Sequence, residues 1–195
     1  ADVLLEPYGG QALGLSVAET TQLTALLAGG TLIGFAIASR VLGQGGAPER
    51  LGLYGALVGV PGFAAIIVSS VAVGAPLFVA GTFATGLGAG LFGHATLTST
   101  LRRAPKDQIG LALGAWGAVQ ATCAGIGVAM AGGIRDMLLA TGAFGGLQAH
   151  APYNMVFMIE IAFLAIAALA AVPLVTRVLS DDPQTEPKTH PMEVS

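Results

Sequence analysis

The sequence predicts an all-α protein: a polytopic membrane helix bundle with about five transmembrane helices. Between Arg50 and Arg102 the chain carries no Asp, Glu, Lys or Arg, which leaves 51 uncharged residues (51–101) in a row. Charged residues make up only 10% of the 195 residues, whereas an average soluble domain is about 25% charged. Glycine is frequent, with 29 residues, and glycine-rich apolar helices are typical of close packing inside a membrane. The lipid bilayer is therefore the first partner that the sequence predicts.

The first two predicted spans cover residues 21–42 and 51–73. Glu19 bounds the first span, and Arg40 stands near its end. Pro61 lies inside the second span, where we expect a kink that neighbouring helices make tolerable by satisfying the freed carbonyl. Each span has the roughly 20 residues that an apolar helix needs to cross the hydrocarbon core.

A turn divides the long uncharged run into two spans. The run is too long for one span and about right for two. Gly74 and Pro76 form the turn signal inside it, so the third span begins directly afterwards. The fourth span lies between Asp107 and Arg135. The third, fourth and fifth predicted spans are residues 77–101, 109–134 and 153–178.

Basic residues predict the orientation of the spans. If the five spans alternate, seven of the eight Lys and Arg residues fall on one side of the membrane, and only Arg135 falls on the other. The positive-inside rule makes the seven-residue side cytoplasmic, which places the carboxyl terminus in the cytoplasm. Arg102, Arg103 and Lys106 follow the third span, where we expect them to contact anionic lipid heads. The seven residues are Arg40, Arg50, Arg102, Arg103, Lys106, Arg177 and Lys188.

The two ends of the chain are predicted to lie outside the bundle, which covers residues 20–179. The chain starts on the outer side of the membrane, without Met and without a recognisable signal peptide. We therefore expect residues 1–19 to be the end of a preceding helix plus an outer loop. The chain would then be the carboxyl-terminal part of a longer transporter-like protein. Residues 180–195 are polar and rich in proline, which predicts a disordered cytoplasmic tail.

Four of the predicted spans contain a Gly-x-x-x-Gly pair. Glycines four residues apart lie on one face of a helix and let the backbone of a neighbouring helix approach closely. Four such pairs in register with the spans predict a tightly packed bundle, although they do not indicate what the bundle handles. The pairs are Gly30/Gly34, Gly55/Gly59, Gly86/Gly90 and Gly110/Gly114.

Three polar side chains inside the spans are the candidates for function, because polar groups at membrane depth are costly. His94 could ligate a metal, including the magnesium of a chlorin, serve a proton relay, or hydrogen-bond a neighbouring helix. Glu160 could couple to protons, contact a polar ligand, or hydrogen-bond between helices. Gln120 could contact a ligand near mid-membrane or make an interhelical amide contact. Arg135 and Asp136 are expected to form a local pair at the outer end of the fourth span.

The sequence does not predict an enzyme, and no nucleic-acid partner is expected. It contains no Cys-x-x-Cys pair, no His-Glu-x-x-His motif, no phosphate-binding loop motif and no Gly-x-Ser-x-Gly motif. The glycine-rich segment GTFATGLGAGLFGH lies inside the third span rather than after a strand. A phosphate-binding loop is therefore excluded by its context.

Two long runs of sequence carry a family resemblance. The chain opens with DVLLEPYGGQALGLSVAETTQLTAL, and it later reads LFGHATLTSTLRRAPKDQIGLALGAWGAVQATCAG followed by GGIRD. These runs resemble the PucC family, the bacteriochlorophyll-delivery members of the major facilitator superfamily in phototrophic bacteria. The resemblance covers nearly the whole chain apart from the tail. The signature residues are Asp2, Glu6, Pro7, Tyr8, Gly9, Gly10 and Trp116.

The resemblance implies a fold of twelve helices in two halves of six. Residues 2–10 would then be the outer end of the seventh helix, and the five spans would be helices eight to twelve. The loop after the first span departs from the family pattern, because Ser39 precedes Arg40 where the facilitator loop usually holds an Asp. This departure weakens the expectation of ordinary alternating-access transport.

The resemblance also implies a function, the assembly of light-harvesting complexes by delivering or shepherding bacteriochlorophyll to antenna complexes. His94, Glu160 and Gln120 become candidate pigment contacts, and His94 is the candidate ligand of the pigment's magnesium. The implied partners are antenna polypeptides and pigment-synthesis enzymes, in a bacterial inner or intracytoplasmic photosynthetic membrane. One alternative is a proton-coupled small-molecule transporter of the major facilitator superfamily built around Glu160. Another is an incomplete half that serves only as a helix-packing partner.

Overall fold

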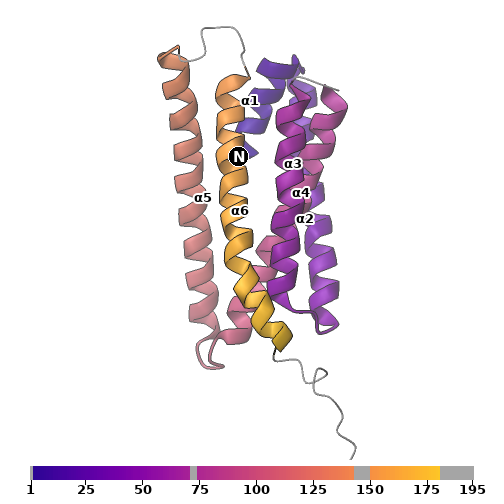
Figure 1. The fold of residues 1–195 in the computed structure, drawn as a ribbon, viewed down its shortest axis with the longest axis vertical. Helices are drawn as coiled ribbons and strands as arrows, with labels where there is room; N and C mark the ends of the chain where they lie inside the picture. The colour runs from indigo at the N-terminus through magenta and orange to yellow at the C-terminus, as the bar shows by residue number, and fades with distance from the viewer. Residues whose placement is uncertain (1, 71–73, 143–149, 181–195) are drawn as a thin grey trace, which may run out of the picture.

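The computed structural model of this protein describes residues 2–70, 74–142 and 150–180 (Figure 1). No strand occurs in these ranges, so the all-α class predicted from the sequence is confirmed. Six helices follow one another along the described chain. They are α1 (Asp2–Leu13), α2 (Val17–Gly43), α3 (Pro48–Ser69), α4 (Ala75–Arg103), α5 (Ile109–Ala140) and α6 (Ala151–Ser180).

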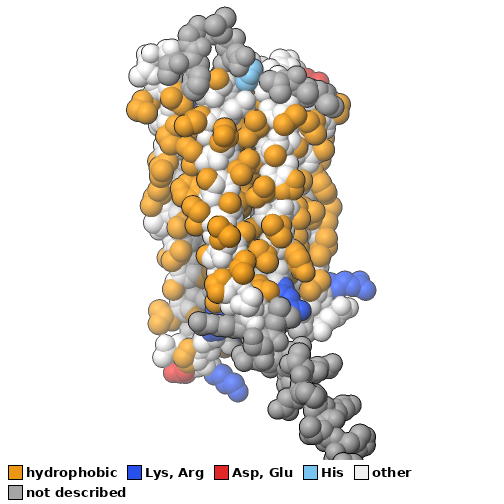
Figure 2. All heavy atoms as spheres, viewed as in Figure 1, with side chains coloured by type: hydrophobic (Ala, Val, Ile, Leu, Met, Phe, Trp, Pro, Cys, Tyr) orange, Lys and Arg blue, Asp and Glu red, His pale blue; other side chains and the backbone are white. Residues whose placement is uncertain are grey.

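Five of these helices, α2 to α6, are long and apolar enough to cross a membrane. Figure 2 shows the matching belt of hydrophobic side chains, with Lys and Arg side chains at its lower end in that view. The chain is therefore a multi-pass membrane protein, and the predicted bundle of about five spans is confirmed. The 12 residues of α1 described here extend over about 18 Å.

The helix ends differ from the predicted spans by a few residues. α4 runs beyond the third predicted span at both ends, and α5 runs beyond the fourth at its carboxyl end. Gly74 precedes α4 with a φ of 65°, and Pro76 lies in the first turn, where a missing N–H breaks no helical hydrogen bond. The predicted tail from residue 181 onward lies outside the described residues.

α2 begins at a capping box that the sequence spells as Ser16-x-x-Glu19. The backbone N–H of Glu19 donates to the Ser16 hydroxyl at 3.3 Å, and the backbone N–H of Ser16 donates to the Glu19 carboxylate at 2.8 Å. The two bonds satisfy N–H groups that the first helical turn would otherwise leave without acceptors. The turn from α1 into α2 is therefore fixed by local hydrogen bonds.

α4 packs against both α2 and α3 through glycine. A Cβ atom added at Gly34 of α2 would lie 2.5 Å from the carbonyl oxygen of Leu87 and 3.0 Å from the Cα of Gly90. A Cβ added at Gly55 of α3 would lie 2.8 Å from the carbonyl oxygen of Gly88. Neither distance leaves room for a side chain, so the helix backbones meet directly. α4 is thus held between two neighbours at close range.

α5 departs from this arrangement. No described atom lies within 4 Å of a Cβ added at Gly110 or Gly114. Of the 32 residues of α5, Ala131 alone is buried in the described part of the protein. Figure 1 shows α5 standing at one side of the bundle, next to α6. Close packing through the predicted glycine pairs is therefore found for α2, α3 and α4, but not for α5.

An aromatic cluster anchors α1 at the end of the bundle opposite Arg102 and Arg103. The ring of Tyr8 is fully buried, with centroids 5.4 Å from Phe78, 5.8 Å from Tyr153 and 5.3 Å from Phe157. The Tyr8 hydroxyl donates a buried hydrogen bond to the carbonyl oxygen of Ile66 at 2.9 Å. This cluster joins α1 to α3, α4 and α6, so α1 closes one end of the space between the helices.

Candidate functional site

A central cavity of about 400 Å³ lies between the helices, next to α1. All six helices contribute to its lining, from Leu5 on α1 to Leu164 on α6. Most of the lining side chains are apolar, and a few polar ones lie among them. This size and composition are typical of a site for a small amphipathic ligand. We call it the central cavity.

Glycine explains why this cavity exists. Gly55 and Gly59 of α3, together with Gly88 and Gly93 of α4, form part of its lining. At these four positions no side chain projects into the space between the helices. The glycines of α3 and α4 therefore account both for the close packing of these helices and for part of the central cavity.

Four polar side chains line the central cavity. The Thr31 hydroxyl donates to the carbonyl oxygens of Leu27 (3.0 Å) and Gly86 (3.2 Å), and the Thr85 hydroxyl donates to a carbonyl one turn earlier on α4. Both threonine hydroxyl groups therefore already donate their hydrogen to backbone carbonyl oxygens. Gln120 of α5 and Glu160 of α6 are the two longer polar side chains of the lining. The structure thus brings together two of the three predicted site residues, although 40 residues separate them in sequence.

Glu160 also lines a second cavity of about 380 Å³ between α5 and α6. We call this the α5–α6 cavity. Apart from Glu160, its lining consists of glycine, alanine, a thiol and apolar side chains such as Met130 and Phe163. Glu160 is therefore shared by an apolar cavity and a cavity of mixed lining.

His94 lies apart from these two residues. It is half-buried on α4, and its ring centroid lies 5.8 Å from that of Phe35 on α2. His94 is not among the described residues that line the central cavity, although its neighbour Gly93 is. A Cβ added at Gly93 would also lie 3.7 Å from Phe35, so both positions adjoin α2. Successive helical residues point about 100° apart, and of the two only Gly93 lines the cavity. A histidine contact to a ligand would have to form at the α2–α4 surface.

Sequence reasoning missed part of the cavity face of α4. Thr85, Ala89, Phe92 and Gly93 line the central cavity together with Gly88. Their spacing of three and four residues marks one helix face, and that periodicity is present in the sequence. The periodicity alone does not say whether the face meets a neighbouring helix or a cavity.

The family-signature residues at the start of the chain mainly serve packing. Tyr8 belongs to the aromatic cluster, and a Cβ added at Gly9 would lie 3.2 Å from Phe78 and 3.3 Å from Leu23. Glu6 is exposed and accepts a hydrogen bond from the Thr24 hydroxyl at 2.5 Å. Pro7 lies inside α1, as does Gly10, while the side chain of Asp2 lies outside the described part.

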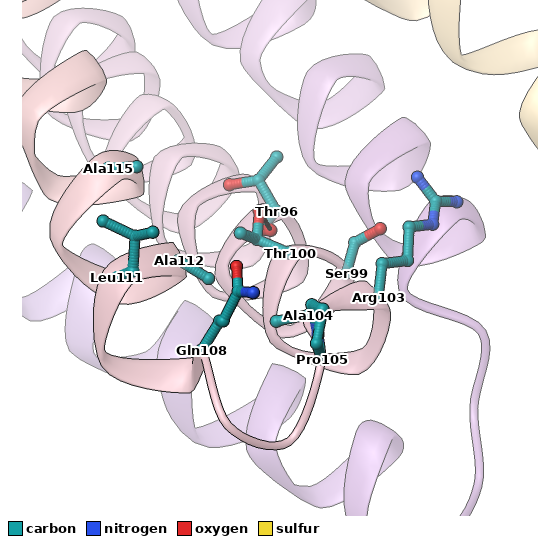
Figure 3. Close-up of a pocket in the computed structure, with 10 residues that line it drawn as sticks. All are labelled: Thr96, Ser99, Thr100, Arg103, Ala104, Pro105, Gln108, Leu111, Ala112 and Ala115. Carbon is teal, nitrogen blue, oxygen red and sulfur yellow. Dashed lines mark hydrogen bonds between the residues drawn. The ribbon is translucent and has the colours of Figure 1, made fainter.

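A third cavity of about 530 Å³ lies at the basic end, between the end of α4 and the start of α5 (Figure 3). Figure 3 shows Gln108 pointing into it, while the guanidinium of Arg103 turns away from α5. That guanidinium pairs with Glu49 at 2.7 Å, and Glu49 also accepts from Ser99 at 3.2 Å. Trp116 ties α5 to α4 nearby through a 3.4 Å hydrogen bond to the Thr96 hydroxyl. None of the three candidate pigment contacts lines this cavity.

The remaining charged residues hold helix ends together. Arg102 donates to the carbonyl oxygens of Leu42 and Gly46, each at 3.1 Å, which caps the carboxyl end of α2. The predicted pair of Arg135 and Asp136 is confirmed, with an N–O distance of 2.8 Å. Arg135 also lies over the ring of Tyr153, 5.6 Å from its centroid, and so connects α5 to α6.

The chemistry of the cavities suits noncovalent binding. In the described part of the chain, no group of three or more His, Cys, Asp or Glu residues could hold a metal ion. The central cavity instead combines apolar walls with one amide and one carboxyl group. Such a lining can hold an apolar body and orient one or two polar substituents.

Comparison with known proteins gives consistent matches. The family model described as "PUCC protein" matches residues 1–179. Protein PucC of Rhodobacter capsulatus is 63% identical over 179 residues, which are 91% of this chain and 39% of that protein. Protein PucC of Cereibacter sphaeroides is 51% identical over 180 residues, 92% of this chain and 39% of that protein. No solved structure was found to match.

A further relative has a different name. A Rhodobacter capsulatus protein, described as an uncharacterized protein in the puhA-bchM intergenic region, is 45% identical over 178 residues. These residues are 89% of this chain and 37% of that protein. The chain thus spans about two fifths of the length of the relatives compared here. Because the family model covers all six helices and the identities reach 63%, this chain belongs to the PucC family.

Proposed function

We propose that this chain is part of an assembly factor that delivers or shepherds bacteriochlorophyll to light-harvesting antenna complexes. Membership of the PucC family supports a role in the photosynthetic apparatus. The observation that carries the proposal further is the pair of cavities that share Glu160. They offer a membrane-embedded volume that is mostly apolar and has polar groups at one place, as an amphipathic pigment requires.

The lining residues fit such a cargo. A bacteriochlorophyll molecule has a flat macrocycle with polar substituents, a central magnesium ion and a long hydrocarbon tail. Gln120 and Glu160 supply oxygen atoms, the ligand type that magnesium prefers, and both can contact polar ring substituents. His94 would reach a pigment only at the α2–α4 surface, so the cavity favours Gln120 and Glu160 as contacts. Binding of this kind is noncovalent and needs no enzymatic step.

Pigment content tests the proposal. The full-length protein is purified from a pigment-producing host, and its bound bacteriochlorophyll is measured by absorbance. We expect Gln120→Leu to lower the bound pigment about tenfold, because the loss of one hydrogen bond between Gln120 and the proposed pigment would cost about 1.4 kcal/mol. Gln22→Leu is the matched control, since Gln22 is an exposed residue of α2 outside the cavity lining.

Two results would argue against the proposal in different ways. Unmodified protein without pigment would contradict a delivery role altogether. Loss of pigment in His94→Ala but not in Gln120→Leu would move the site to the α2–α4 surface and contradict the cavity as the site.

The proposed partners and location follow from the same role. An assembly factor of this kind would contact antenna polypeptides and pigment-synthesis enzymes in the inner or intracytoplasmic photosynthetic membrane. Its carboxyl terminus would lie in the cytoplasm, as the basic residues predict. Isolation of the protein from that membrane together with antenna polypeptides would support these partners.

The position of Glu160 also favours a second candidate, a proton-coupled small-molecule transporter. A carboxyl group at membrane depth that lines two cavities is a typical location for proton coupling. On this alternative, uptake into vesicles depends on pH, and Glu160→Gln abolishes that dependence. Normal uptake by Glu160→Gln would contradict the mechanism.

A further inference from the structure

The α5–α6 cavity is more apolar than the central cavity, with which it shares Glu160. Its lining includes the hydrocarbon and thioether side chains of Ile126, Met130, Ile134, Val156, Ile159 and Phe163. Apart from the thiol of Cys123, Glu160 supplies its polar group. A ligand in this volume therefore meets mostly hydrocarbon, and Glu160 is the carboxyl group that it can contact there.

Small residues and a contact at one end create this volume. Arg135 over the ring of Tyr153 connects α5 and α6 near the outer end. Farther along the helices, Gly127 and Ala131 of α5 face the cavity. No described atom lies within 4 Å of a Cβ added at Gly127, so the space beside α5 is open.

Exposed apolar side chains form one edge of the α5–α6 cavity. Ile126, Met130 and Phe163 are 55%, 47% and 57% exposed, and all three lie on helices that are apolar enough to cross a membrane. A hydrocarbon chain can therefore reach the cavity along this apolar edge without crossing a polar barrier.

The depth of Glu160 restricts the head group of the ligand. Glu160 lies nine residues after Ala151, which is about 14 Å along α6 and within a hydrocarbon core about 30 Å thick. A phospholipid would have to bring a negative phosphate to this depth and next to a carboxyl group. Charge and depth both disfavour that, whereas an uncharged polar head fits beside Glu160 and Gln120.

We propose that the α5–α6 cavity binds the tail of a single-tailed amphiphile whose uncharged head lies in the central cavity. The geometry that carries this proposal is the all but apolar lining on one side of Glu160 and the polar lining on the other. The ligand class is a long hydrocarbon, such as an isoprenoid chain, attached to an uncharged polar group. Identification of this amphiphile with bacteriochlorophyll rests on the proposed function, whereas the tail site does not.

Two glycines of α5 provide a matched pair of variants. Gly127→Phe places a bulky ring in the α5–α6 cavity. Gly125→Phe makes the same change at an α5 position that does not line the cavity. No described atom lies within 4 Å of a Cβ added at Gly125. Equal helix content and equal size-exclusion profiles would show that both variants fold.

Binding is measured on the full-length protein in detergent with two pigments. One is bacteriochlorophyll, and the other is its methyl ester, in which a methyl group replaces the tail without adding charge. We expect Gly127→Phe to weaken bacteriochlorophyll binding about tenfold or more, because displacing two methylene groups from an apolar site has that effect. The methyl ester should bind the variant as it binds the unmodified protein, and Gly125→Phe should change neither affinity.

Three results would overturn the tail site. Unchanged bacteriochlorophyll binding in Gly127→Phe would show that the cavity holds no tail. Equal weakening of both pigments would show that the ring, not the tail, lies there. Competition by phosphatidylglycerol as strong as competition by a C20 isoprenoid alcohol would contradict the uncharged, single-tailed ligand class.

If the protein does not bind bacteriochlorophyll at all, the experiment gives a result different from these three. In that case neither pigment binds the unmodified protein, and the isoprenoid alcohol alone becomes the probe. The tail site then requires that Gly127→Phe weaken binding of the alcohol about tenfold relative to Gly125→Phe. Equal binding of the alcohol by both variants would overturn it.

Discussion

Tyr8 performs two tasks with one side chain. Its ring fills the space between α1, α4 and α6, where it contacts Phe78, Tyr153 and Phe157. Its hydroxyl, in a place without exposure to solvent, donates to the carbonyl oxygen of Ile66. A buried hydroxyl without a partner would be costly, so this bond fixes both the depth and the rotation of α1.

Tyr8→Phe removes the hydroxyl and keeps the ring. We expect a loss of about 1 kcal/mol in the free energy of unfolding, because the hydrogen bond from the Tyr8 hydroxyl to the carbonyl oxygen of Ile66 is removed. Unfolding in mixed micelles of rising SDS content measures the effect. Tyr54→Phe is the control, because Tyr54 is 58% exposed, and its change should stay within about 0.5 kcal/mol. Equal effects of the two substitutions would contradict a specific role of the Tyr8 hydroxyl.

At the scale of residues, the sequence identified polar groups but not their surroundings. Glu160 and Gln120 were recognisable because polar side chains are rare inside apolar spans. Their meeting at one cavity depends on how α5 and α6 lie relative to each other, which no local pattern contains. His94 was equally recognisable, yet the helical turn between Gly93 and His94 separates it from that cavity. The roles of all three in pigment binding stay predictions.

At the scale of helices, the same glycine pattern has two different outcomes. Gly34 of α2 meets the backbone of α4, whereas Gly114 of α5 has no described atom within 4 Å of an added Cβ. The spacing of the glycines is identical in both helices. Among the described residues, a neighbouring helix lies against Gly34 but not against Gly114. The spacing of the glycines does not predict this difference.

The same substitution should therefore have opposite effects in the two helices. Gly34→Ala places a Cβ 2.5 Å from the carbonyl oxygen of Leu87, so α2 must move, and we expect a loss of about 1–3 kcal/mol. Gly114→Ala meets open space and improves helix propensity, so we expect no loss and a gain of up to about 1 kcal/mol. SDS-induced unfolding measures both variants. A loss in Gly114→Ala as large as that in Gly34→Ala would show that α5 has a packing partner after all.

At the scale of the whole molecule, charge and apolar surface define two ends and a belt. The hydrophobic belt in Figure 2 separates an end with Lys and Arg side chains from the end that carries α1. Arg102 and Arg103 of α4 lie at the basic end, where they bond to the α2–α3 connection and to Glu49. The asymmetry predicts that this end faces the cytoplasm.

Cysteine labelling tests that orientation. Gln44 at the end of α2 and Ala140 at the end of α5 are both exposed and lie at opposite ends of the bundle. In a Cys123→Ala background, a membrane-impermeant maleimide should label Gln44→Cys only in inside-out vesicles. It should label Ala140→Cys only in intact spheroplasts. The reverse pattern would contradict the positive-inside assignment, and labelling of both from one side would contradict an odd number of spans between them.

The class of the molecule was predictable because the bilayer imposes it. A chain with 51 consecutive uncharged residues has few options besides membrane helices, and turn signals such as Gly74 divide the run. The packing order of the helices was not predictable, since every span is apolar all round. The twelve-helix arrangement that the family resemblance implies stays a prediction, because the chain spans 39% of the PucC proteins compared here.

The glycine contacts around α4 also determine whether a second substitution can compensate for a bulky one. In an ordinary core, a bulky substitution can be compensated by a smaller residue at the facing position. Gly34 faces Gly90, which is already the smallest residue, and the other neighbours are backbone atoms of Leu87 and Leu91. Backbone has no rotamers to adjust, so only the displacement of a whole helix makes room. A suppressor screen started from Gly34→Val should therefore recover reversions to glycine rather than changes at the facing positions.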